Sequence, residues 1–281
     1  MNRHFAIALV FLAAGSASAA ERKLDKTFTA TPGGSLVVEA DAASVRVSGT
    51  DTSQVVVHML AEASEKDLAD IKLEAVQTGD GVKVTLRRGD KGSSWFNWRS
   101  WTGEQRIEVT VPRRYTVNVR TGGGEIELKD TAGTATLKTS GGDITARNLT
   151  GTVQLRTSGG AINADSIRGD VDADTSGGDV RLLRIDGKIK ADTSGGNVRV
   201  GLVGANREIS ATTSGGDIEV IVPRGTSGNV EASTSGGHIE SNLPMSTSVQ
   251  KEGRLEGSMN GGGPQIYAHT SGGSISLRAE N

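Results

Sequence analysis

The stretch TSGGDITARNLTGTVQLRTSGGAINADSIRGDVDAD, residues 139–174, contains two consecutive copies of an 18-residue unit that opens with a TSGG block. The same T-[SG]-G-G opening recurs at a constant spacing of 18 residues, and three further blocks follow at wider spacing. The regular blocks begin at Thr121, Thr139, Thr157, Thr175 and Thr193, and the later blocks begin at Thr213, Thr234 and Thr270. A fixed period of this kind indicates a repeat architecture in which similar units stack.

Each unit contains two stretches in which apolar and polar residues alternate, which is the pattern of a half-buried β-strand. One stretch follows the TSGG block, as at Ile144 and Ala146, and the other precedes the next block, as at Val153 and Leu155. Neither stretch can bury its apolar face alone, so we expect successive units to stack at the inter-strand spacing of about 4.8 Å. The sequence therefore predicts an all-β fold, a parallel β-solenoid (β-helix) with about 18 residues per turn, two main strands per turn and capped ends.

Glycine marks the corner between the two predicted strands of each unit. Glycine permits the positive φ that a sharp corner often needs. The corner glycines are Gly133, Gly151, Gly169, Gly187 and Gly228. We interpret the recurring threonine as an inward-facing ladder of hydroxyl groups that form hydrogen bonds at the corner.

The chain divides into three predicted segments. Residues 1–20 combine Arg3, an apolar run and a small-residue end, the features of a cleaved signal peptide. Residues 21–101 are expected to form an N-terminal cap and degenerate solenoid turns with a Trp-rich insertion at 94–101, and residues 102–281 the regular repeat. We expect residues 21–35 and 242–265 to cover or distort the two ends, because an exposed end offers unpaired strand edges to other chains.

Composition narrows the functional classes. The chain has 39 Gly and 3% aromatic residues, and it lacks the cysteine needed for disulfides or for a lipid anchor. Without Arg3 the chain has 30 Lys and Arg and 33 Asp and Glu. This balance of charge argues against a nucleic-acid partner. No later stretch approaches the roughly 18 apolar residues of a membrane helix. We expect an exported protein, periplasmic or at the cell surface, with no transmembrane segment in its mature chain.

The candidate binding residues form two groups. The first is the aromatic cluster SSWFNWRSW, which adds seven residues to the 18-residue spacing and contains Trp95, Phe96, Trp98, Arg99 and Trp101. Exposed tryptophans stack on sugar rings, enter membrane interfaces or anchor protein partners, although the cluster could equally fold back as a lid. The second group is the outward column that precedes each threonine, in which Arg120, Lys138 and Arg156 are followed by Asp174 and Asp192. Solvated faces are the simpler interpretation of that column.

Catalytic and metal-binding motifs are not predicted. The carboxylates that follow the glycines occur in only half the units, at 18-residue rather than nine-residue spacing, which argues against shared calcium sites. A single threonine per strand also argues against ice binding. The histidines are scattered, and the sequence has no HExxH, GxSxG or cysteine nucleophile. We therefore predict neither catalytic residues, nor a metal site, nor a cofactor.

The TSGGDI-type blocks, the leading segment PGGSLVVEADAASVRVSG (residues 32–49) and the segment VPRRYTVNVRTGGGEIEL (residues 111–128) resemble the bacterial putative-adhesin family, a domain of unknown function. The resemblance covers nearly the whole mature chain and implies a β-helix with an adhesive role. We expect a non-catalytic, adhesin-like binding or scaffold module of the cell envelope, with an envelope glycan, a lipid head group or a surface protein as partner. The alternatives are a periplasmic structural or envelope-stress accessory protein and, less favoured, a β-helical enzyme acting on polysaccharide.

Overall fold

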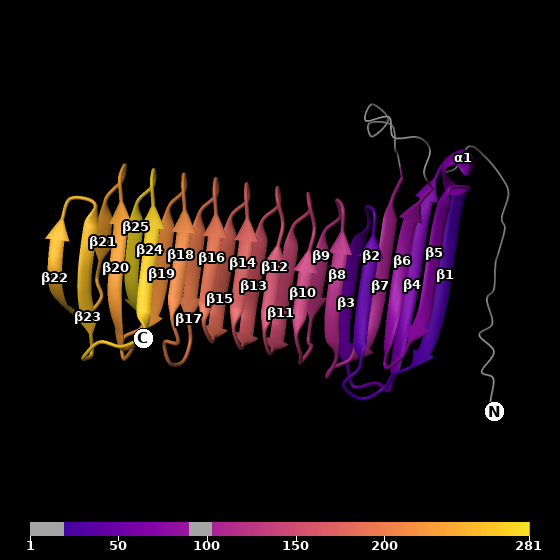
Figure 1. Cartoon of the computed structure of the whole chain (residues 1–281), viewed down its shortest axis with the longest axis horizontal. Helices are drawn as coiled ribbons and strands as arrows, with labels where there is room; N and C mark the ends of the chain where they lie inside the picture. The colour runs from indigo at the N-terminus through magenta and orange to yellow at the C-terminus, as the bar shows by residue number, and fades with distance from the viewer. Residues whose placement is uncertain (1–19, 90–102, 281) are drawn as a thin grey trace.

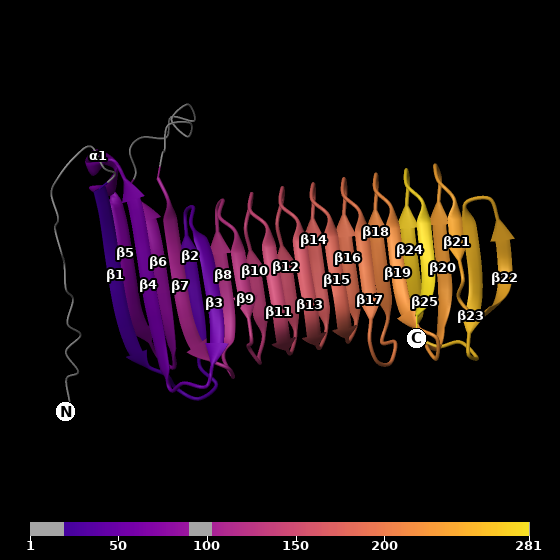
Figure 2. The same ribbon diagram turned by 180° about the vertical axis from the view of Figure 1, so that it is seen from behind.

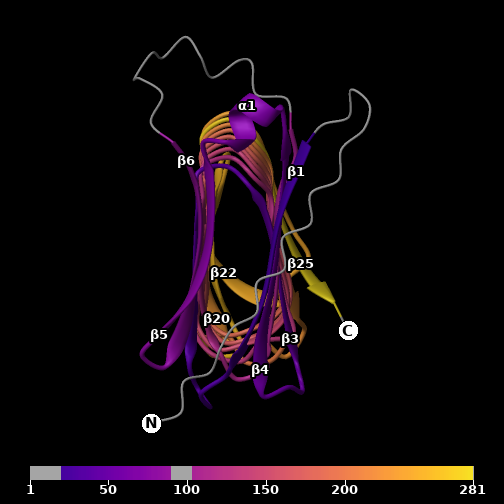
Figure 3. The same cartoon turned by 90° about the vertical axis from the view of Figure 1, so that its right-hand side faces the viewer.

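The computed structural model describes residues 20–89 and 103–280, which form two large β-sheets stacked face to face. Strands run across the long axis of the molecule, and loops line its two long edges (Figures 1 and 2). Figure 3, viewed along that axis, shows the two sheets as two layers. Within the described ranges, no helix has the length and apolarity needed to cross a membrane.

The first sheet contains twelve described strands. Their order is β1 (Ala20–Thr29), β4 (Gln54–Ala63), β7 (Gln105–Pro112), β3 (Ser44–Thr50), β9 (Ile126–Lys129), β11 (Ile144–Thr150), β13 (Ile162–Arg168), β15 (Val180–Asp186), β17 (Val198–Leu202), β19 (Ile218–Pro223), β25 (Ile275–Glu280) and β21 (Ile239–Ser241). A one-turn helix, α1 (Glu65–Leu68), follows β4, and the side chain of Ser64 caps its N-terminus.

The second sheet contains thirteen described strands. Their order is β22 (Met245–Lys251), β23 (Arg254–Met259), β20 (Gly228–Thr234), β24 (Gln265–Thr270), β18 (Ile209–Thr213), β16 (Ile189–Thr193), β14 (Val171–Thr175), β12 (Val153–Arg156), β10 (Ala135–Lys138), β8 (Thr116–Thr121), β2 (Ser35–Ala40), β6 (Gly81–Arg88) and β5 (Ile71–Thr78). The strand that precedes a TSGG block lies in this sheet, and the strand that follows the block lies in the first sheet.

The 18-residue repeat sets the register in the middle of both sheets. Ile144 pairs with Ile162, Ile162 with Val180, and Val180 with Val198, all between parallel neighbours. These side chains are buried between the sheets, in one apolar core that extends from Leu36 to Ala279. Because burying one Ile, Leu or Val contributes about 1.5–3 kcal/mol relative to exposure, the stacked apolar columns are the main source of stability.

The predicted parallel β-solenoid is wrong, although the all-β class is confirmed. Both sheets are mixed, because the pairs β1–β4, β4–β7, β5–β6, β20–β23 and β22–β23 are antiparallel. Strand order also departs from chain order: β2 lies between β8 and β6, and β25 lies between β19 and β21. The chain therefore does not coil through one continuous series of parallel turns.

The physical reason for this difference lies at the two ends of the sheets. The repeat fixes pairing only where the apolar columns of successive units coincide. Toward the ends, two-residue turns connect neighbouring strands into antiparallel hairpins. Gly79-Asp80 connects β5 to β6, and Glu252-Gly253 connects β22 to β23. Gly79 and Gly253 have φ of 56° and 71°, the left-handed conformation that such short turns need.

The predicted threonine ladder is confirmed. The Thr157 side chain is 6% exposed; its hydroxyl donates to the carbonyl of Gly142 at 2.9 Å and accepts from the amide of Gly160 at 3.3 Å. The hydroxyls of Thr139, Thr175, Thr193 and Thr213 donate in the same way at 2.8–2.9 Å. Each hydroxyl thus joins one TSGG turn to its neighbour and satisfies backbone groups that strand pairing leaves free.

The corner glycines are confirmed in part. Gly133, Gly151 and Gly169 have φ of 145°, 122° and 140°, as a positive-φ corner requires. Gly187 and Gly228 do not have positive φ and are restricted by space instead. A Cβ at Gly187 would lie 2.1 Å from the carbonyl oxygen of Gly169, and one at Gly228 would lie 2.8 Å from the side chain of Asn206.

The N-terminal end of the molecule is tied together across the two sheets. There, Lys26 of β1 donates to the carbonyl of Ala75 on β5 at 2.9 Å, and Gln77 of β5 donates to the carbonyl of Thr29 on β1 at 3.2 Å. Arg22 donates to the carbonyl of Ile71 in the same way. These side chains occupy backbone acceptors at sheet edges, which would otherwise be open to pairing with other chains.

Candidate functional site

The outer face of the second sheet brings together the predicted basic column. Arg120, Lys138 and Arg156 lie at or next to the ends of the adjacent strands β8, β10 and β12, where Lys138 is in register with both of the others. Alternation with buried Val119, Leu137 and Leu155 directs the three cationic side chains away from the core. The strand spacing thus places three positive charges side by side on one face.

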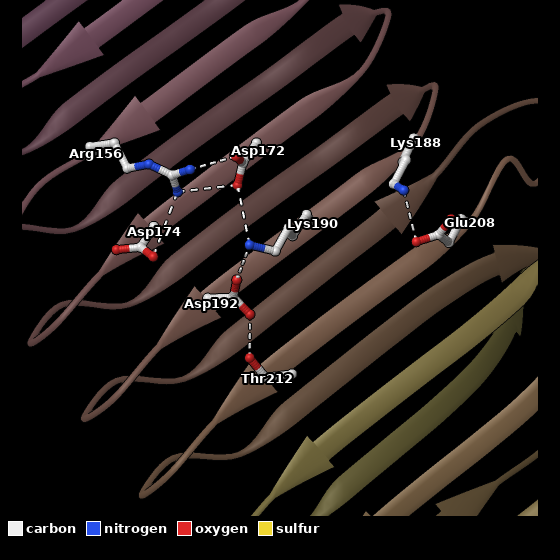
Figure 4. A network of polar contacts seen from close by, with 8 residues as sticks. All are labelled: Arg156, Asp172, Asp174, Lys188, Lys190, Asp192, Glu208 and Thr212. Atoms are coloured by element: carbon white, nitrogen blue, oxygen red, sulfur yellow. Dashed lines mark hydrogen bonds and ion pairs between the residues drawn. The ribbon is translucent and has the colours of Figure 1, made fainter.

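Arg156 belongs to an ion-pair network that continues over the following strands (Figure 4). Its guanidinium contacts both carboxylate oxygens of Asp172, one of them at 3.1 Å, and lies 3.6 Å from Asp174. Lys190 lies 2.9 Å from Asp192, whose hydrogen bond raises the pKa of the lysine, and Asp192 accepts a further hydrogen bond from Thr212. The structure therefore places Arg156 at the boundary between the basic and acidic halves of the column.

Arg120 and Lys138 differ from Arg156. Both are exposed, and among the residues that the structure describes neither forms an ion pair or a side-chain hydrogen bond. Two unneutralised cations on adjacent strands repel each other, because like charges in neighbouring positions of a sheet are unfavourable. An anion bound between them would remove that cost.

Arg120 and Lys138 line a shallow depression of about 290 Å³, together with Arg87 and Ser140. Arg87 comes from β6 and enters the site because β6 pairs with β2, and β2 with β8. Glu39 and Asp41 supply the acidic groups of the wall. We call this surface the basic depression.

The acidic groups of the basic depression are already engaged. Glu39 lies 3.1 Å from Lys83 and 3.2 Å from Arg87, and the hydrogen bond from Lys83 is the main reason that the pKa of Glu39 lies below its ordinary value. Asp41 accepts a hydrogen bond from the amide of Arg88 at 2.7 Å. Because these carboxylates have partners, Arg120 and Lys138 remain the groups able to receive a new ligand.

The carboxylates that follow the TSGG glycines have a structural role. Asp143 accepts from the amide of Ala161, Asp179 from that of Asn197, and Asp217 from that of Ser274, each at 2.7 Å. Each side chain thus supports the same position of the neighbouring turn. The described residues contain no group of three His, Asp or Glu side chains arranged to hold a metal ion.

Part of the predicted site lies outside the described residues: Trp95, Phe96, Trp98, Arg99 and Trp101 all fall between residues 90 and 102. Sequence reasoning missed Glu39, Asp41 and Ser140. Glu39 and Asp41 become part of the basic depression only through the non-sequential pairing of β2 with β8 and β6, whereas Ser140 lies there because it follows Lys138 closely in the chain. The position of Ser140 directly after Thr139 was the one available signal, because it fixes the residue at a turn beside Lys138.

Solved structures with low sequence identity are similar to this chain over most of its length. A "putative lipid binding protein" from Parabacteroides distasonis is 12% identical and superposes with a TM-score of 0.51, over 92% of this chain and 96% of that one. A "putative adhesin" from the same species is 12% identical with a TM-score of 0.40, covering 92% and 97% of the two chains. Another from Bacteroides fragilis is 11% identical with a TM-score of 0.36 and the same coverage.

Sequence comparison assigns the family. No sequence among the curated proteins matches this chain. The family model described as Toastrack DUF4097 matches residues 34–278, which include nearly all the strands of both sheets. The chain belongs to the Toastrack DUF4097 family.

Proposed function

We propose that this protein is an exported, non-catalytic, adhesin-like binding or scaffold module of the bacterial cell envelope, and that the basic depression is its contact surface for an anionic group. The proposal rests on one observation: Arg120 and Lys138 are exposed beside each other without a partner among the described residues, while the neighbouring Arg156, Lys190 and Glu39 are ion-paired.

The depression suits a phosphate or carboxylate carried by a larger molecule. Arg can hold two oxygens of such a group at once, whereas Lys acts as a point charge. The site is shallow and open, and it lies on the outer face of a broad sheet. Such a site suits an anionic group carried on a membrane surface or along a polysaccharide better than a small substrate that must be enclosed. The shared chemistry is an exposed anion, with a lipid head group and an acidic envelope glycan as its two sources.

Vesicle and polysaccharide binding test the proposal and separate the two sources. The full mature chain is titrated with vesicles of phosphatidylglycerol and phosphatidylcholine, with pure phosphatidylcholine vesicles, and separately with polygalacturonate. We expect binding to one anionic probe, and we expect Arg120→Glu with Lys138→Glu to weaken it at least about tenfold, because each cation near an anionic surface contributes about 1 kcal/mol.

The matched control is Lys129→Glu with Arg147→Glu. These two cations lie on adjacent strands of the other sheet, and replacing both with Glu changes the net charge by the same amount. Equal loss in both double variants would show that net charge alone is responsible and would remove the basic depression as the site. Binding to neither anionic probe would reject the proposed ligand class; a protein partner captured by crosslinking would then favour the accessory role.

The aromatic cluster remains a separate sequence-based proposal. Replacing Trp95, Trp98 and Trp101 with Ala should abolish binding to a glycan, membrane or protein partner while leaving the circular dichroism spectrum unchanged. Unchanged binding in that variant would reject the aromatic cluster as a contact surface and leave the basic depression as the only proposed one.

A further inference from the structure

A second hollow, of about 590 Å³, lies on the outer face of the second sheet near its C-terminal end. It is formed over β20, β23 and β22, the antiparallel strands that end the sheet in Figure 1. Asn229 and Glu231 of β20 face outward, because Val230 and Ala232 between and beside them are buried. We call this surface the polar hollow.

Polar side chains make up almost the whole lining of the polar hollow. They are Asn229, Glu231, Ser246, Ser248, Arg254, Glu256, Ser258 and Gln265. The hydroxyls of Ser246, Ser248 and Ser258 have no hydrogen-bond partner among the described residues. A pocket of this size is ordinarily lined by apolar groups when it binds an apolar ligand. This lining instead suits a ligand that carries many hydroxyl groups.

Among the described residues that line the hollow, the only cation, Arg254, is shared between the two carboxylates, Glu231 and Glu256, so the lining is negative rather than basic. Arg254 lies 2.5 Å from Glu256 and 3.5 Å from Glu231, and Gln265 donates to the other oxygen of Glu231 at 3.2 Å. Unlike the basic depression, the hollow therefore presents no unpaired cation to an anion. Each carboxylate still has free lone pairs, and carboxylate and amide groups can accept from or donate to neighbouring hydroxyls of a ligand.

An aromatic surface lies beside the hollow. Tyr267 of β24 is in register with Glu231, and its ring stacks on that of His269 with centroids 6.4 Å apart and planes inclined by 20°. Both side chains are partly exposed on the outer face. A flat aromatic ring next to hydroxyl, amide and carboxylate groups matches a pyranose ring, which has an apolar face and a polar rim.

The strand β22 contains a β-bulge beside the hollow. The register with β23 shifts between Thr247 and Val249, so Ser248 is the extra residue. Bulges occur often next to functional sites. Ser246 and Ser248, which are separated by one residue, both line the hollow.

From these contacts we infer that the polar hollow binds a neutral saccharide unit, with Tyr267 against the apolar face of the sugar and Glu231, Glu256 and the three serines around its hydroxyls. The inference does not depend on the basic depression. It gives the molecule a second binding surface with a different ligand chemistry on the same sheet.

Calorimetric titration of the full mature chain with cellotetraose, maltotetraose and chitotetraose tests this inference. We expect at least one of these neutral oligosaccharides to bind with a Kd of about 1 mM or tighter. Tyr267→Ala should weaken that binding about tenfold, whereas Tyr267→Phe, which keeps the ring, should stay within about threefold. Ser258→Leu, which fills the hollow, should also remove binding.

Two control variants make the result specific. Ser210→Ala changes the register neighbour of Tyr267 on β18, outside the hollow, and should bind like the unaltered protein. Arg120→Glu with Lys138→Glu removes the basic depression and should leave saccharide binding intact, so the two proposals can fail separately. The inference is overturned if no oligosaccharide binds at up to about 10 mM, or if Tyr267→Ala and Ser258→Leu bind normally.

Discussion

The second glycine of each TSGG block is required by space. A Cβ at Gly178 would lie 2.1 Å from the carbonyl oxygen of Gly160 in the neighbouring turn, whereas one at Gly177 would have its nearest contact at 3.5 Å. We expect Gly178→Ala to lower the free energy of unfolding by about 3 kcal/mol, because the backbone of the adjacent turn must move. Gly177→Ala is the matched control and should change it by less than about 1 kcal/mol. Urea denaturation of both variants measures the difference, and equal effects would contradict the stacking argument.

Tyr115 is another residue whose environment leads to a measurable prediction. Its side chain is 2% exposed, and its hydroxyl has no hydrogen-bond partner among the described residues. Tyr115→Phe should therefore raise the free energy of unfolding by about 1 kcal/mol at pH 7, because it removes an unsatisfied buried group.

The same residue predicts a pH dependence. Burial raises the pKa of Tyr115 above its ordinary value of 10.0, so the folded state keeps this proton more firmly than the unfolded state. The resulting stabilisation is complete below pH 10.0 and is lost as the pH rises toward the folded-state pKa. Urea midpoints above pH 10.0 should fall more steeply for the unaltered protein than for Tyr115→Phe. Parallel curves would show that Tyr115 does not titrate in this transition.

At the scale of the strand, the ion pair between Arg156 and Asp172 limits the basic surface. Asp172→Asn should leave Arg156, the register neighbour of Lys138, with only its longer 3.6 Å contact to Asp174, and so make its charge more available at the edge of the basic depression. We expect anionic vesicles to bind about fivefold more tightly, the effect of roughly 1 kcal/mol per added cation. Asp51→Asn is the control, because it breaks the ion pair with Arg113 and makes the same change in charge elsewhere. Equal gains in the two variants would mean that only net charge matters.

The strands were predictable from the sequence to the extent that they repeat. The alternation around Thr139, Thr157 and Thr175 gave the strands on each side of the block, the buried column and the outward position of Arg120 and Lys138. The 18-residue spacing also gave their mutual register. These features follow from local side-chain alternation and from a period that every unit shares.

The rest could not be read from the repeat, because it depends on pairing between distant segments. One of the two neighbours of β8 is β2, more than 75 residues earlier, and this contact brings Arg87 and Glu39 to the basic depression. The polar hollow is formed by β20 together with the segment 242–265, where the TSGG period is lost and an antiparallel hairpin replaces it. The dipeptide Glu252-Gly253 was a signal for that turn, but it does not specify which strand the hairpin joins.

At the scale of the whole molecule, the long sheet separates two surfaces of different chemistry. Between β10, at the basic depression, and β20, at the polar hollow, lie β12, β14, β16, β18 and β24. Six inter-strand steps of about 4.8 Å place them roughly 29 Å apart, which exceeds the screening length of about 8 Å at physiological salt. The two sites should therefore bind independently, and they should respond differently to salt.

Because the two surfaces lie apart on the same sheet, we predict that a single molecule can join two ligands. Phosphatidylglycerol vesicles should be retained on a resin that carries the oligosaccharide bound by the polar hollow, but only when the protein is present. Raising the salt concentration should release the vesicles and leave the protein on the resin, because screening weakens the charged contacts and not the neutral ones. Arg120→Glu with Lys138→Glu should abolish vesicle capture alone, whereas Tyr267→Ala should abolish attachment to the resin. If vesicles and saccharide instead displace each other from the protein, the two surfaces act as one site and the bridging role fails.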